Sequence, residues 1–230
     1  MQLHPKQILV LCGWIVPQQT SPLSGFAHGA AGFSWALFQL AEVTGETIFA
    51  KTAEAAIAYE RTLFDSETLN WFDLRIWDGL PEGTGKPSMC AWCAGAAGIG
   101  LARLSTAERF HSEEAHKEID AALNTTIRTG FGDNHSLCHG DLGNIDLLLQ
   151  ASRVLKDERS RLTAQRIVHE LVEAISRDEY RCGTPLHVES PGLMTGLAGI
   201  GYGLLRTALP DRVPSVLTLQ PPIEAWEEQP

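Results

Sequence analysis

Seven stretches of the chain show the apolar spacing of α-helices, and they alternate between two kinds. One kind is rich in small and apolar residues, whereas the other carries apolar residues on one stripe and charged residues elsewhere. The clearest stripe consists of Val168, Leu171, Val172 and Ile175. The helices predicted from this pattern cover residues 29–44, 46–64, 96–105, 112–129, 141–156, 158–178 and 196–208. The alternation predicts an all-α fold built from helical hairpins.

The segments between these helices suggest the limits of the folded part. Residues 65–90 show no regular pattern, and the proline-rich end is expected to be disordered beyond residue 219. We therefore expect an N-terminal segment of uncertain structure (1–21), one helical domain (22–219) and a flexible tail (220–230).

A Gly-x-x-Gly pattern stands at the start of each small-residue helix, with its first glycine at 29, 95, 140 and 196. Glycine allows the chain to turn tightly and allows helix starts to crowd together. The free N–H groups at these helix starts would then point toward a common centre. The unequal spacing of the four patterns excludes a strict solenoid repeat and fits hairpins with loops of variable length.

Two of these turns carry residues with the chemistry of metal ligands, namely Cys93, Cys138 and His139. Thiolate and imidazole are ligands that zinc prefers, and three protein ligands with an open fourth position form a catalytic site. The two cysteines stand much further apart than in a zinc finger. A buried cysteine is also an ordinary small hydrophobic residue. The spacing by itself therefore leaves both interpretations open.

Composition limits the partners and the cellular compartment that we expect for the protein. Hydrophobic residues make up 44% of the 230 residues, which supports a buried core, and the formal net charge is −10. That charge argues against nucleic acid and anionic membranes as partners. Five cysteines without an even, short-spaced framework indicate thiols in a reducing compartment. The apolar run at 7–16 is too short to span a bilayer, and no clean cleavage site follows it, so we expect a cytoplasmic protein.

Four motifs, in this order along the chain, resemble those of the lanthionine synthetase C-like cyclases. They are Gly25–Gly32 (GFAHGAAG), Trp92-Cys93, His135–Asn144 (HSLCHGDLGN) and Pro191–Tyr202 (PGLMTGLAGIGY). The resemblance is closest to the C-terminal cyclase domain of class II lanthipeptide synthetases, the LanM type. It implies an α/α toroid, in which inner helices are ringed by outer ones. The chain has only about three and a half of the helical hairpins that make up the family's toroid. An incomplete toroid, about the C-terminal half, is therefore expected.

The same resemblance implies a reaction and its residues. Cys93, Cys138 and His139 match the family's zinc ligands, and His28 matches a histidine that the family places near the metal for proton transfer. His28 is equally consistent with a residue that only caps its turn. The implied reaction adds a cysteine thiol of a precursor peptide to dehydroalanine or dehydrobutyrine in the same peptide, which forms a thioether ring. A separate N-terminal half or dehydratase domain is an expected partner.

Departures from the family pattern favour a second possibility. The family commonly has His or Tyr where this chain has Ala94, and class I cyclases often have Arg where it has Met89. A catalytically impaired zinc-binding or peptide-binding fragment is therefore the alternative, and a helical scaffold without metal is a further one. Asp141 and Asn144 are expected either to orient the His139 ring or to cap a helix, and we favour capping.

Overall fold

The computed structural model describes residues 11–17, 19–75, 87–107, 112–177 and 179–222. Within them lie seven α-helices: α1 (Ala30–Thr44), α2 (Thr47–Arg61), α3 (Ala96–Thr106), α4 (Glu113–Thr129), α5 (Asp141–Val154), α6 (Glu158–Ser176) and α7 (Leu197–Ala208). A two-stranded hairpin, β1 (Phe64–Asp65) and β2 (Asn70–Trp71), and a 3-10 turn, η1 (Pro185–His187), complete the regular structure. Every predicted helix is present, with ends within three residues of those expected.

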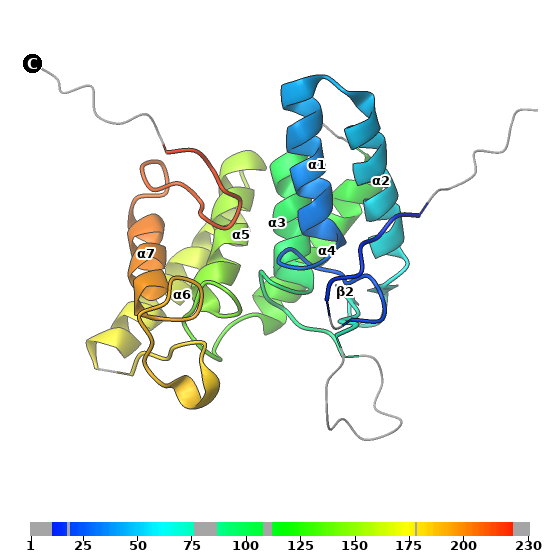
Figure 1. The fold of residues 1–230 in the computed structure, drawn as a ribbon. Coiled ribbons are helices and arrows are strands. Elements are labelled where there is room, and N and C mark those ends of the chain that lie inside the picture. Colours follow the sequence, from blue (N-terminus) through cyan, green and yellow to red (C-terminus); the bar gives the residue numbers. More distant parts are fainter. Residues whose placement is uncertain (1–10, 18, 76–86, 108–111, 178, 223–230) are drawn as a thin grey trace, which may run out of the picture.

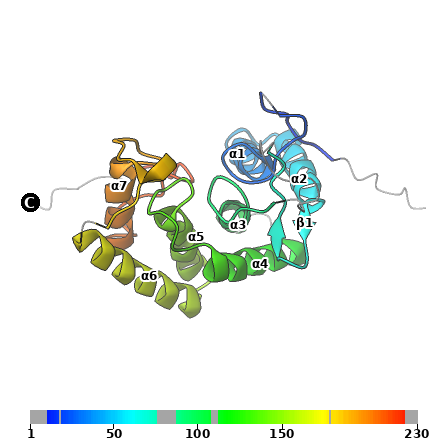
Figure 2. The same ribbon diagram turned by 90° about the horizontal axis from the view of Figure 1, so that it is seen from below.

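The helices form an arc of hairpins in two layers (Figures 1 and 2). Helices α1, α3, α5 and α7 stand side by side as the inner layer, while α2, α4 and α6 cover the outside. Each of the three outer helices packs against the inner helix that precedes it in the chain. The four Gly-rich turns lie together at one end of the inner helices (Figure 1).

Burial explains the two kinds of sequence pattern. All but one residue of α3 is buried, because α3 is packed between its neighbours in both layers. Gly100 makes this possible, since a Cβ atom there would meet the Ala122 methyl group of α4 at 2.6 Å. Outer helices need only one buried stripe, and in α4 this stripe includes Ile119 and Leu123.

The predicted stripe of α6 is partly wrong. The buried side chains of α6 are Ser160, Ala164, Ile167 and Leu171, whereas Val172 is 48% exposed. Leu171 belongs to both stripes, and Val168 and Ile175 are half-buried and pack against the same core, so Val172 is the one member of the predicted stripe that faces solvent. Apolar residues are present on both sides of this line, so periodicity by itself does not decide which side faces the core.

The connection after α2 contains the second difference. In place of an irregular segment, residues 64–71 form the β1–β2 hairpin, in which Phe64 pairs with Trp71. Trp71 is fully buried and its ring contacts Phe64 at a centroid distance of 4.8 Å. Two-residue strands are too short to show a period of two, which is why the sequence pattern missed them. Residues 76–86 of this connection lie outside the described part of the chain.

The expected terminal segments are described only in part. Residues 1–10 and 223–230 lie outside the described part of the chain. In the part that follows residue 10, the Cys12 N–H donates to the Ala55 carbonyl at 3.2 Å, and the Trp14 ring contacts that of Phe33 at 4.6 Å. This segment therefore packs on α1 and α2. No described helix has the combination of length and apolar character needed to span a membrane.

Candidate metal centre

Backbone hydrogen bonds link the four Gly-rich turns in series. The Ala27 N–H donates to the Cys93 carbonyl at 3.2 Å, and the Cys93 N–H donates to the Cys138 carbonyl at 3.2 Å. The Cys138 N–H in turn donates to the Met194 carbonyl at 2.8 Å. All four residues stand two positions before the glycine that caps an inner helix. Equivalent positions of the four turns therefore lie next to one another at one end of the inner helices.

Cys93, Cys138 and His139 come together at this end. Each offers one ligand atom, and these atoms all lie within 4.8 Å of one another. A tetrahedral zinc ion with bonds of about 2.0–2.3 Å would hold such atoms about 3.4–3.8 Å apart, so small side-chain rotations bring the three into range. The described residues add no fourth member to the cluster. Two sulfur atoms, one imidazole nitrogen and one free position fit a catalytic zinc site.

The Cys93 and Cys138 thiols shift each other's pKa in opposite directions. A hydrogen bond from Cys138, supported by the charge of Arg75 and opposed by burial, lowers the pKa of Cys93. The same hydrogen bond raises the pKa of Cys138. The Arg75 guanidinium is held by the buried Asp73 carboxylate, with Nε at 2.9 and 3.0 Å from its two oxygens. Arg75 also reaches the Met89 sulfur at 3.2 Å, so this chain places a cation beside the position where class I cyclases often have arginine.

His28 lies on the first Gly-rich turn, directly after Ala27. Its side chain is exposed, and it does not belong to the Cys93–Cys138–His139 cluster. The Ala27 hydrogen bond to Cys93 nevertheless fixes the His28 turn beside a candidate ligand. Ala94 is 4% exposed, and the Gly25 backbone packs against it.

Asp141 and Asn144 do neither of the two things predicted for them. Gly140 is the N-cap of α5, and the Asp141 carboxylate instead accepts the Gly132 N–H at 2.8 Å. The Asn144 amide donates to the carbonyls of Cys90 at 2.9 Å and Gly130 at 2.6 Å. Both side chains therefore fasten neighbouring loops to the start of α5. The Gly183 backbone lies close to the His139 ring, and a Cβ atom on Gly183 would lie 3.0 Å from Nε2.

Three buried polar side chains that sequence reasoning missed hold the turns in place. They are Glu60 for the His28 turn, Asn70 for the Cys93 turn and Asn134 for the Cys138–His139 turn. Asn70 accepts the Ala96 N–H at 2.9 Å and donates to the Met89 carbonyl at 3.2 Å. Their position as polar residues within or beside apolar stretches could have marked them in the sequence. Nothing in their spacing, however, indicates which turn each of them would bind.

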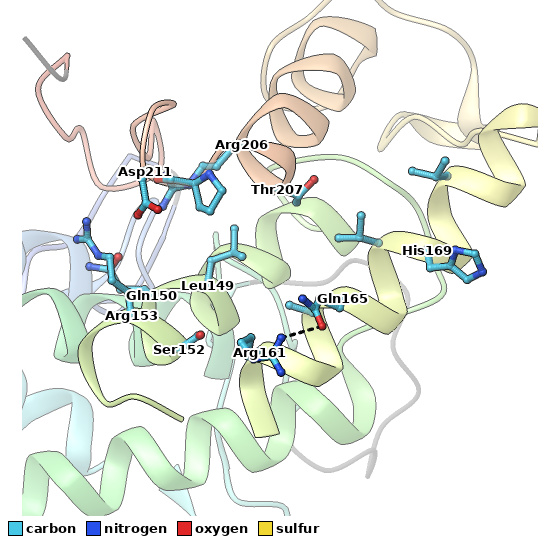
Figure 3. A pocket seen from close by; sticks show the side chains of 14 residues that line it. Leu149, Gln150, Ser152, Arg153, Arg161, Gln165, His169, Arg206, Thr207 and Asp211 are labelled. Carbon is cyan, nitrogen blue, oxygen red and sulfur yellow. Dashed lines mark hydrogen bonds between the residues drawn. The ribbon is translucent and has the colours of Figure 1, made fainter. Parts of the chain in front are cut away.

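A hollow of about 620 Å³ lies away from the metal centre, between α5, α6 and the end of α7 (Figure 3). Its walls include Leu149 and Arg153 near the end of α5, Val168 in α6 and Thr207 in α7. The turns stand at the opposite ends of α5 and α7, so this hollow is not part of the candidate site. It lies where α7 has no outer helix of its own among the described residues.

An arc of helical hairpins whose inner helix starts gather two thiols and an imidazole defines an α/α-toroid protein with a candidate metal centre at the ends of its inner helices. Residues 10–218 match the family described as "Lanthionine synthetase C-like protein", and the chain belongs to that family.

One curated protein and one solved structure are similar to this chain. The lacticin 481/lactococcin biosynthesis protein LcnDR2 of Lactococcus lactis subsp. lactis is 27% identical over 197 residues, which are 80% of this chain and 20% of that protein. The structure of nisin cyclase matches with a TM-score of 0.65 and 19% identity, over 82% of this chain and 47% of that one. The predicted family and the incomplete α/α toroid are thereby confirmed. The chain spans only about a fifth of the curated relative and about half of the solved one.

Proposed function

We propose that this protein closes thioether rings by adding a peptide cysteine thiol to dehydroalanine or dehydrobutyrine, at a zinc ion held by Cys93, Cys138 and His139. The convergence of these three ligand atoms within 4.8 Å carries the proposal. Membership in the lanthionine synthetase C-like family and the likeness to nisin cyclase support the same reaction class. The substrate we propose is a precursor peptide whose serine or threonine residues have already lost water.

Zinc, His28 and Arg75 would have separate roles in the proposed cyclisation. Zinc, when bound, would lower the pKa of the substrate cysteine thiol, so that the thiolate is available near neutral pH. The sulfur forms a bond to the β-carbon of the dehydro residue, and the resulting enolate must take up a proton at its α-carbon. His28, on the turn that contacts Cys93, is the proposed donor. The Arg75 guanidinium favours the ionised Cys93 thiol and would offset negative charge at a zinc centre with two cysteine ligands.

The loss of free thiol from a dehydrated precursor peptide, measured against the uncatalysed rate at the same pH, tests the proposal. Cys138→Ala should abolish turnover. His28→Ala should lower kcat about a hundredfold to ten-thousandfold, the usual contribution of a general acid or base, while zinc stays bound. Cys90→Ala is the matched control, because Cys90 is a thiol on the same loop outside the cluster.

Two results would contradict different parts of the proposal. Full turnover in the His28→Ala variant would show that another group donates the proton. No acceleration by zinc-loaded protein over a range of dehydrated peptides would reject the cyclase activity itself.

A further inference from the structure

The turn that carries His28 is tied at both ends to one buried carboxylate. Glu60 in α2 has no exposed surface, and its Oε1 accepts the Gly25 N–H at 2.9 Å and the Ala31 N–H at 3.1 Å. These two donors flank the His28 turn. A single oxygen atom of α2 therefore sets the position of the backbone from which the His28 side chain extends.

The other oxygen of Glu60 connects this turn to the helix of the candidate metal centre. Oε2 accepts a hydrogen bond from Arg103 Nη2 at 2.7 Å, and Arg103 belongs to α3, the helix that follows Cys93 directly. Arg103 is 2% exposed and its Nε also binds Glu118 of α4 at 2.7 Å. Glu118 in turn binds Arg61 at 2.5 Å. The buried network therefore fixes the His28 turn relative to the Cys93 turn through three helices.

The Glu60 side chain differs from the side chains that hold the other two turns because it carries a charge. Asn70 and Asn134 hold the turns of the candidate ligands with neutral amides, and Asn134 accepts the Ser136 N–H at 3.0 Å. A neutral side chain is thus sufficient to hold such a turn. A buried ion pair loses much of its attraction to desolvation and is a weak source of stability, so its value lies more in fixing one arrangement. Arg103 accordingly ties Glu60 to α3 as well as to the turn.

The His28 imidazole is the group that the Glu60 network would position. It is exposed, and it forms no hydrogen bond within the part of the chain that the structure describes. Its approach to a substrate at Cys93 is therefore set by the turn backbone and not by contacts of its own ring.

We propose that Glu60 is a positioning residue for His28, which acts through its hydrogen bonds to Gly25 and Ala31 and its ion pair with Arg103. This inference rests on the proposed function in one respect, because it assigns the positioned group to proton transfer. The turn is held in place whatever reaction the protein performs.

The test compares Glu60→Gln with a matched control. Glutamine keeps the size and one acceptor oxygen but turns an amide donor toward Arg103. The control is Asp146→Asn, which breaks another buried pair, between Asp146 of α5 and Arg206 of α7, at 2.5 Å. Hydrogen–deuterium exchange is followed in peptides covering 23–32, with 134–144 as the internal reference. Glu60→Gln should speed exchange in 23–32 about tenfold or more, and Asp146→Asn should leave it unchanged.

Cyclisation kinetics then test the link to His28. Glu60→Gln should lower kcat more than it changes KM, with zinc content unchanged, and should cause no further loss in a His28→Ala background. Unchanged exchange in 23–32, equal exchange in the Asp146→Asn control, or additive losses in the double variant would each overturn the inference.

A milder variant covers the case in which Glu60→Gln fails to fold. Arg103→Lys keeps the charge and loses the fork that binds Glu60 and Glu118 together, so it should show the same exchange pattern with a smaller amplitude. If the wild-type protein does not cyclise any peptide, the proposed function fails. The exchange experiment then still decides whether Glu60 positions the turn.

Discussion

Cysteines in this chain differ by their surroundings, and only two of the five belong to the candidate centre. Cys90 is three residues before Cys93, but its sulfur lies 3.6 Å from the Thr126 hydroxyl, and burial raises the pKa of its thiol. Cys182 is fully buried. Both behave as packed apolar residues, whereas Cys93 and Cys138 share a hydrogen bond beside His139. Position in the turn thus separates candidate ligands from ordinary thiols.

Zinc content gives the first prediction. Purified protein should hold one zinc ion per chain, and Cys138→Ala should lose most of it, because two ligands hold the ion far less tightly than three. Elemental analysis after dialysis against a weak chelator measures the ratio. Cys90→Ala should keep the wild-type content, and equal zinc loss in both variants would contradict the ligand set.

Asp141 gives a prediction about pH. Burial raises the pKa of this carboxyl to about 6, against about 3.9 in an unfolded chain. The folded metal-free protein therefore binds more protons between these values, so its free energy of unfolding falls as the pH rises from about 4 to 6 and stays lower above that. Asp141→Asn keeps an acceptor for the Gly132 N–H and cannot ionise. It should match the wild type near pH 4 and be more stable at pH 8, by at most about 3 kcal/mol.

Denaturant titrations of the metal-free protein at the two pH values measure this difference. An advantage of the same size at both would mean that packing, and not ionisation, explains it.

Helices in this fold owe their crowded starts to glycine, most strictly at Gly95. Gly95 precedes α3 with φ 84° and ψ −157°, a conformation essentially restricted to glycine. A Cβ atom there would overlap the Met89 carbonyl oxygen. The turn that carries Cys93 can therefore close only around a residue without a side chain.

Paired glycine substitutions test this difference. Gly95→Ala should cost about 3 kcal/mol or more, because backbone strain adds to steric overlap. Gly201→Ala should stabilise the protein by about 0.5–1 kcal/mol, since Gly201 lies inside α7 with no atom within 4 Å of the new methyl group. Thermal or urea unfolding measures both. A tolerated Gly95→Ala would show that the turn can open without loss of the fold.

The whole molecule is an arc with an exposed apolar edge. Along α7, Leu197 and Leu205 are 40% and 56% exposed and stand eight positions apart with Gly201 midway, so they lie on one face of the helix. The hollow beside α7 adds further apolar wall (Figure 3). Apolar surface of this kind, left without a cover, promotes association.

We therefore expect this chain by itself to associate as its concentration rises. Sedimentation velocity over a hundredfold range of concentration measures this, and Leu205→Lys should shift the distribution toward monomer. Leu186→Lys is the control, because Leu186 is 94% exposed but lies outside α7, in η1. A monodisperse monomer throughout, with a sharp cooperative melt, would count against the expectation.

Sequence by itself determined the helices, their order and the candidate ligands of this protein. Periodicity and capping glycines act within a few residues, so the starts of α3, α5 and α7 followed from Gly95, Gly140 and Gly196. Family motifs then supplied the pairing of Cys93 with Cys138-His139, which no local rule contains.

Only the tertiary structure decided which polar side chains serve the candidate site. Glu60 reaches Gly25 across 35 positions of the chain, and Asn144 reaches Cys90 across 54. Such contacts depend on how helices approach one another after they form, and the same residues would suit a solvated surface equally well. Arg75 beside Met89 and the true buried stripe of α6 were decided in the same way, because packing between distant segments leaves no periodic trace in the sequence.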